Sequence, residues 1–99
     1  MTRTSDAELE RWRKLDVEDV VRIITPHAVM DATFVPIKAR NSRRWHVCVG
    51  ARHFELVATG PRFFDTRSRA GGAGAVDLAM HLHGSGFKVA VAILRERGL

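Results

Sequence analysis

Apolar residues at the start of the chain recur with the period of a helix. A first helix is predicted over residues 5–15, with Ser5 or Asp6 as its cap, and Glu8 completes a capping box with Ser5. A second helical stretch follows from about residue 16, and Pro26 ends it because the residue before a proline avoids helical backbone angles. The first quarter of the chain is therefore predicted to form two helices.

The pattern changes to alternation in the middle of the chain. Residues 43–50 and 53–59 place apolar side chains at every second position, which predicts two half-buried strands in a hairpin. Residues 32–39 and 62–66 are predicted to form further short strands. The first of these is expected at a sheet edge, because Pro36 cannot donate a ladder hydrogen bond. We therefore expect an antiparallel sheet of three to four strands.

The last third returns to helical spacing. A glycine-rich break over residues 68–75 precedes predicted helices over residues 75–84 and 87–98. The order of elements indicates an α+β domain, a small antiparallel sheet flanked by N-terminal and C-terminal helices. We expect one domain, with residues 1–15 as a helical extension and residues 16–99 as its core.

The composition is that of an ordinary globular chain, with 45% hydrophobic and 27% charged residues. No apolar run is long enough for a membrane span, and the charged N-terminus lacks the apolar region of a secretory signal. The single cysteine, Cys48, cannot form an internal disulfide. A reducing, cytoplasmic location is therefore expected.

Positive charge is concentrated in the middle third of the chain. The 99 residues hold 16 Lys and Arg against 11 Asp and Glu, and residues 38–69 alone hold eight bases against two acids. Such a region is the electrostatic footprint expected of a protein that binds a polyanion, provided that its side chains converge on one surface. The alternative is a solvated surface that maintains solubility. The predicted nucleic-acid contacts are Lys38, Arg40, Arg43, Arg44, Arg52, Arg62, Phe64, Arg67 and Arg69.

Aromatic residues lie among these bases, as in domains that stack nucleic-acid bases on a sheet. The alternation of Trp45 and Phe54 with valine and leucine favours a place in the core for both. One of the consecutive pair Phe63 and Phe64 must face outward in a regular strand. That outward side chain, for which we choose Phe64, is the better candidate for contact with a base.

The sequence gives little support for phosphate binding by the glycines, for a catalytic cysteine or for a zinc site. The glycine-rich residues 71–77 precede a helix and suit phosphate binding, but glycines that permit close packing are the simpler interpretation. Cys48 with His46 or His53 imitates a thiol–imidazole pair, yet a lone cysteine in an alternating strand is usually a small buried apolar residue. Structural zinc needs four ligands in paired spacings, which are absent. We therefore expect no enzyme activity, no metal and no cofactor.

One combination of motifs extends over residues 16–97. An aromatic strand leads to a glycine-rich turn, then to a helix that begins Ala-Val and contains a Met, a short break and a second apolar helix. This combination resembles the zinc-finger domain at the N-terminus of bacterial-type DNA primases, in the versions that plasmid and mobile-element proteins carry with a Toprim domain. The residues of the resemblance are Phe63, Phe64, Gly71, Gly72, Gly74, Ala75, Val76, Met80, Phe87, Ala90, Val91 and Leu94.

The resemblance implies a zinc-finger-like fold that has lost its metal. The positions of the family's zinc ligands fall near Lys38 and Asn41 and on Thr66 and Arg69, none of which binds zinc. In that family the domain contacts the template strand, while a separate Toprim domain performs the chemistry.

The resulting hypothesis is a non-catalytic module of a plasmid or mobile-element primase, replication or conjugation protein that binds DNA, with single-stranded DNA preferred. The alternative is a protein-interaction module, which docks a Toprim or helicase partner or the rest of its own chain through an apolar patch around Phe63 or Phe64. One-sided clustering of the arginines would favour DNA, whereas an exposed hydrophobic patch with arginines dispersed around the molecule would favour a protein partner. A regulatory role in a plasmid or phage is a third possibility.

Overall fold

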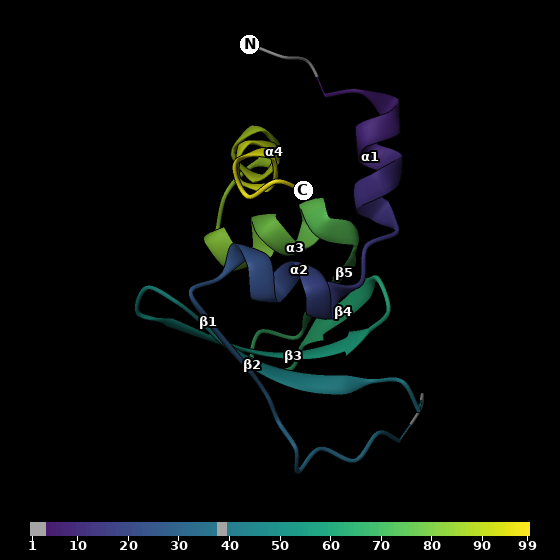
Figure 1. The fold of residues 1–99 in the computed structure, drawn as a ribbon. Coiled ribbons are helices and arrows are strands. Elements are labelled where there is room, and N and C mark those ends of the chain that lie inside the picture. Colours follow the sequence, from purple (N-terminus) through teal and green to yellow (C-terminus); the bar gives the residue numbers. More distant parts are fainter. Residues whose placement is uncertain (1–3, 38–39) are drawn as a thin grey trace.

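A computed structural model describes residues 4–37 and 40–99, and it shows an antiparallel sheet with helices on one of its faces (Figure 1). The sheet has five strands that pair in chain order. The elements are α1 (Asp6–Arg13), α2 (Val17–Ile24), β1 (His27–Met30), β2 (Arg43–Val49), β3 (Arg52–Thr59), β4 (Arg62–Asp65), β5 (Ala70–Ala73), α3 (Gly74–His83) and α4 (Phe87–Glu96).

The helices form two layers above the sheet. Figure 1 shows α2 and α3 next to the sheet, and α1 and α4 beyond them. Trp12 of α1 is fully buried, so the predicted N-terminal extension contributes to the same core as the rest of the chain. The two outer helices are also joined by Arg95, which donates two hydrogen bonds of 2.7 and 2.9 Å to Glu8.

Local sequence signals account for the helix boundaries. The predicted cap is confirmed, because Ser5 Oγ accepts a hydrogen bond from the backbone N–H of Glu8 at 3.1 Å. The apolar stripe of α2 is buried along its whole length, and α3 ends at Gly84 in the left-handed conformation that glycine adopts without strain. The α+β class is therefore confirmed.

The predicted number of strands is too low. The segment predicted as an edge strand, residues 32–39, has no strand in its described part, and the first strand is instead His27–Met30. The glycine-rich segment predicted as a break contains β5, whose Gly72 pairs with Phe63 of β4. Both errors have one cause: strand formation in short segments depends on an available neighbouring strand more than on intrinsic propensity.

Close packing explains Gly72 of β5 and Gly74 at the start of α3. A Cβ atom on Gly72 would lie 2.8 Å from Phe63 Cζ, and Gly74 has a φ of +88° while its backbone N–H donates to the carbonyl of Pro61. These positions exclude larger side chains for steric and conformational reasons. This agrees with the packing interpretation of the segment.

Alternation along the strands creates one covered face and one open face. The covered face, under α2 and α3, includes Trp45, Leu56 and Phe63. The opposite face, which we call the open face, carries a row that crosses four strands. In that row Arg44 pairs with Val57, Val57 with Phe64, and Phe64 with Gly71.

Candidate nucleic-acid interface

Phe64 is the aromatic side chain that the sheet presents to solvent. Its exposed fraction is 45%, compared with 6% for Phe63, so the expectation that one of the two faces outward is confirmed. A Cβ atom built on Gly71 would lie 3.3 Å from Phe64 Cδ1, which places the phenyl ring beside the glycine backbone of β5. The absence of a side chain at Gly71 thus leaves room for the ring at the sheet surface.

A shallow depression of about 270 Å³ lies next to this ring. Its lining includes Val57 and Thr59 of β3 with Arg62 and Phe64 of β4. Ser42 and Thr59 share a hydrogen bond of 2.6 Å at the same end of the sheet. The depression therefore combines an aromatic ring, a guanidinium group and a hydroxyl group, which are suited to a base, a phosphate and a sugar respectively.

The predicted arginines do not converge on one surface. Arg44 and Arg62 lie on the open face with Phe64. Arg43 points to the helix side, where its guanidinium lies 3.6 Å from Glu18 of α2. Arg52 also lies on the helix side, over the ring of Phe54 at 4.9 Å. The reason is the period of two in a strand, which sends consecutive residues to opposite faces.

The remaining predicted bases lie in loops. Arg67 and Arg69 are exposed in the turn between β4 and β5, and Arg40 is exposed in the connection between β1 and β2. Lys38 lies outside the described residues. Within the described ranges, Arg62, Arg67 and Arg69 take part in no ion pair, and of these three Arg62 lies on the open face.

Acidic side chains neutralise the β2 side of the open face. Arg44 Nη2 lies 2.9 Å from the carboxylate of Asp31, and its Nη1 lies 3.7 Å from Glu55. His46 Nε2 also lies 3.0 Å from Asp31. Hydrogen bonds from Thr33 and His46 hold the pKa of Asp31 well below its usual range, so this carboxylate stays ionised. Arg44 is consequently a weaker phosphate ligand than Arg62.

Sequence reasoning does not find the pairing of Asp31 and Glu55 with Arg44. The two acids flank a stretch of the sequence without any other acid, but only the β1–β2 and β2–β3 registers bring them to the same arginine. No local pattern in the chain specifies that register.

A second polar pair lies on the covered face. The carboxylate of Asp65 is buried, and His81 Nε2 of α3 lies 2.7 Å from its Oδ2. His81 is half-buried beside the rings of Phe54 and Phe63. The inward position of the Asp65 carboxylate could be predicted from the sequence, because side chains alternate along β4 and an inward Phe63 implies an inward Asp65 two residues later.

The ionisation of Asp65 is set by opposing effects. Burial raises the pKa of Asp65, but hydrogen bonds from His81, from Ser68 and from the backbone N–H of Arg67 outweigh it and lower the pKa. The carboxylate is therefore satisfied by the turn and the helix around it, which indicates a structural role.

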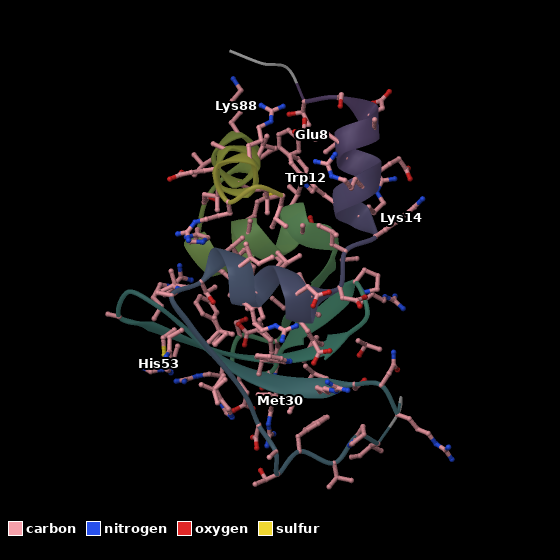
Figure 2. All side chains as sticks on the ribbon, viewed as in Figure 1. Glu8, Trp12, Lys14, Met30, His53 and Lys88 are labelled. Atoms are coloured by element: carbon pink, nitrogen blue, oxygen red, sulfur yellow. The ribbon has the colours of Figure 1, made fainter. Side chains whose placement is uncertain are left out.

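Cys48 and His53 also come together on the open face, with Sγ and Nδ1 3.2 Å apart. No group of three or more His, Cys, Asp or Glu side chains within residues 4–37 and 40–99 is arranged to hold a metal ion. The side chains in Figure 2 place His53 near the end of the sheet, close to the β2–β3 turn.

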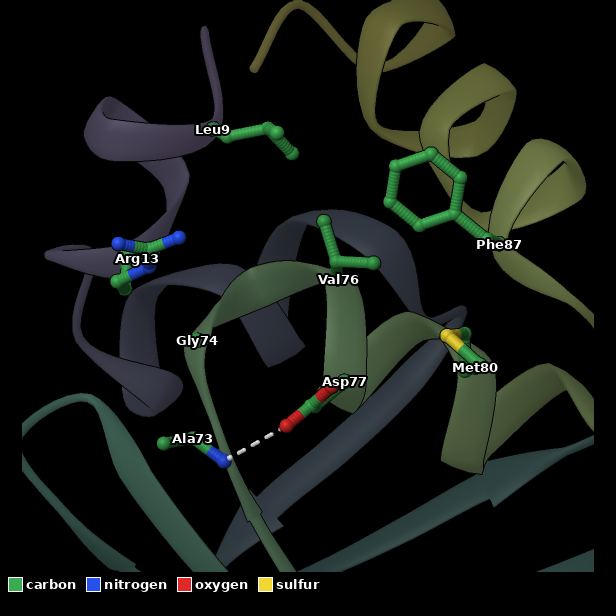
Figure 3. A pocket seen from close by; sticks show the side chains of 8 residues that line it. All are labelled: Leu9, Arg13, Ala73, Gly74, Val76, Asp77, Met80 and Phe87. Atoms are coloured by element: carbon green, nitrogen blue, oxygen red, sulfur yellow. Dashed lines mark hydrogen bonds between the residues drawn. The ribbon is translucent and has the colours of Figure 1, made fainter. Parts of the chain in front are cut away.

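A pocket of about 330 Å³ lies among the helices, away from the open face (Figure 3). Its apolar wall comes from Leu9 of α1, Met80 of α3 and Phe87 of α4, and Arg13 lies at its edge. The dashed line in Figure 3 joins the backbone N–H of Ala73 to the carboxylate of Asp77, which are 3.2 Å apart. Arg13 and Asp77 add charged groups to the pocket lining, which includes no residue of the row around Phe64.

Comparisons with protein-family models, with curated proteins and with solved structures find no match. Among the described residues, no helix has the length and apolar character needed to cross a membrane.

Proposed function

We propose that this protein binds single-stranded nucleic acid on the open face of its sheet, and that it does so as a non-catalytic module. The observation that carries the proposal is the exposed ring of Phe64 beside Arg62 on a sheet face that no helix covers. The resemblance to primase domains favours DNA, in a plasmid or mobile-element replication or conjugation protein.

The arrangement supports a strand that runs along β4. Arg62 and Phe64 are two residues apart on the same face, which corresponds to about 7 Å in a strand. Arg67 and Arg69 are exposed in the turn that follows β4, so two further guanidinium groups follow the ring along the chain. Bases stack on aromatic rings without strong sequence preference, and guanidinium groups hold the flanking phosphates.

The test measures fluorescence anisotropy of a labelled single-stranded oligonucleotide over a series of salt concentrations. Arg62→Glu should weaken binding and reduce the magnitude of the log–log salt slope by about 0.7 for each phosphate that the variant no longer neutralises. Phe64→Ala should weaken binding by about fivefold or more at constant salt slope, because base stacking is not ionic.

Lys88→Glu is the matched control, since it changes the net charge by the same amount as Arg62→Glu. Figure 2 shows Lys88 on α4, on the far side of the helices from the sheet. An equal decrease of affinity in the two charge reversals would contradict a specific site, as would the absence of binding at low salt.

A protein-docking function is the second candidate, because the arginines are divided between two faces and the pocket of Figure 3 is lined by Leu9, Met80 and Phe87. In this alternative a partner protein or another part of the same polypeptide occupies the pocket. Binding of a replication partner that Phe87→Ser abolishes, while Arg62→Glu leaves it unchanged, would favour this function.

A further inference from the structure

The strand β1 forms one edge of the sheet, and the outer side of its backbone is unpaired. The N–H of Asp31 donates to the carbonyl of Arg44 on β2 at 2.8 Å, which fixes the alternation of hydrogen bonds along β1. The N–H and C=O groups of Ala28 and Met30 consequently point away from the sheet. Among the described residues, no side chain and no further strand bonds to these groups.

The opposite edge of the sheet, β5, is protected. The N–H of Gly74 donates to the carbonyl of Pro61, so the preceding N–H of Ala73 points outward, and the carboxylate of Asp77 accepts it at 3.2 Å (Figure 3). Proteins protect sheet edges with such caps, with charged side chains, with prolines or with bulges. Residues 27–30 of β1 include no charged residue, no proline and no bulge.

The β1 edge is also apolar on both of its faces. Val29 is 50% exposed and lies on the open face, in register with His46. Met30 is 43% exposed and lies on the helix side, in register with Trp45. An exposed edge with unpaired backbone groups and apolar side chains is a template for another strand.

We propose that β1 pairs antiparallel with β1 of a second copy of this chain, which joins the two sheets into one. The edge is complementary to itself in the register centred on Val29. There Ala28 lies opposite the second copy's Met30, so all the outward backbone groups of both residues find partners. Val29 meets the same residue of the second copy in a close, non-hydrogen-bonded pair, and the small Ala28 leaves room for Met30.

Neighbouring registers fit less well. Centred on Ala28, the pairing places Met30 opposite Pro26, which has no N–H to donate. Centred on Met30, it places the apolar Val29 opposite the carboxylate of Asp31. The register centred on Val29 therefore gives the best match of backbone groups and side chains.

Charges and faces also agree with this register. His27 lies opposite the second copy's Asp31, so no like charges meet across the new pair. The twofold axis of such a pair is perpendicular to the sheet, which keeps the open faces of both copies on the same side. The joined sheet then carries Phe64 of both copies on one surface, although the pairing itself does not depend on nucleic-acid binding.

The experiment measures the mass of the protein by sedimentation equilibrium over a series of concentrations. The wild-type protein should reach twice the mass of one chain. Val29→Lys should raise the dissociation constant of the dimer by about tenfold or more, because the two ammonium groups meet at the twofold axis. Val29→Glu should do the same, and an equimolar mixture of the two variants should restore association. Val89→Lys, the same substitution at an exposed position of α4, should dimerise like the wild type.

A wild-type protein that stays monomeric up to about 1 mM would overturn the inference, since its dissociation constant would then exceed any specific contact of this kind. A dimer that Val29→Lys leaves unchanged would place the interface elsewhere and overturn it as well. A mixture of Val29→Lys and Val29→Glu that does not associate would contradict the register. Recovery in the mixture also shows that both variants fold, because only folded edges can pair.

Discussion

Neighbouring residues of one strand lie in different environments, because one face of the sheet is covered by helices and the other is open to solvent. Phe63 lies under the helices and Phe64 lies in solvent, and Arg43 and Arg44 are divided in the same manner. On the covered face, polar groups are satisfied by helices and turns. On the open face, Arg44 is neutralised by acids of β3 and the β1–β2 connection, whereas Arg62 is not. A basic stretch in the sequence is therefore not the same as a basic surface.

The phenylalanine pair gives the largest expected contrast. Phe63→Ala should lower the free energy of unfolding by about 3 to 5 kcal/mol, because it leaves a cavity under α3. Phe64→Ala should lower it by less than about 1 kcal/mol, as for other surface positions, while it weakens oligonucleotide binding. Urea denaturation and anisotropy on both variants test the contrast. Equal destabilisation would contradict the assignment of the two faces.

Replacement of the buried Asp65 carboxylate is expected to have the second-largest effect on stability. Asp65→Asn should cost about 2 kcal/mol at pH 7, because the charged hydrogen bond to His81 and those from the turn are weakened. The pKa of Asp65 is lower in the folded protein than its ordinary value of 3.8. The stability that the carboxylate contributes is thus present at neutral pH and is lost as the pH falls below that value.

Denaturation at several pH values from neutral to acidic measures this dependence. The difference in unfolding free energy between wild type and Asp65→Asn should shrink at acidic pH. A difference that stays constant would show that the ionised form of Asp65 is not what stabilises the fold.

The two glycines of β5 provide a smaller contrast. A methyl group at Gly72 meets Phe63 Cζ at 2.8 Å on the covered face, so Gly72→Ala should cost about 1 to 2 kcal/mol through overpacking. At Gly71 the nearest atoms are the backbone oxygen of Phe63 at 3.1 Å and Cδ1 of the exposed Phe64 at 3.3 Å, and neither is as close as the contact at Gly72. Gly71→Ala should therefore destabilise less, and thermal denaturation of the two variants tests the order. The reverse order would contradict the proposed packing.

The smallest effect concerns the neutralised part of the open face. Asp31→Asn removes the charge that pairs with Arg44 and should raise the affinity for a single-stranded oligonucleotide by about twofold to fivefold. The change has the opposite sign to Arg62→Glu. An unchanged affinity would show that the nucleic acid does not reach the β2 side of the sheet.

Much of the fold is predictable because it depends on local patterns. The cap at Ser5, the buried stripe of α2 and the hairpin of β2 and β3 follow from short spacings in the sequence. The strand predicted over residues 32–39 does not form in residues 32–37, because β-branched and aromatic residues there indicate propensity without a partner strand. For the candidate site, the prediction that Phe64 is exposed is confirmed. The expectation that the arginines converge on one surface is wrong, because they are divided between the two faces of the sheet and the loops.

Local spacing along the chain specifies which side chains share a face of each helix or strand, because those periods are set by backbone geometry over a few residues. Tertiary structure decided which strands became neighbours, and through them which acids met Arg44 and which helix supplied His81 to Asp65. Those pairings join residues distant in the chain, and they depend on how the whole core packs. The charge of a surface is for that reason a property of the folded chain.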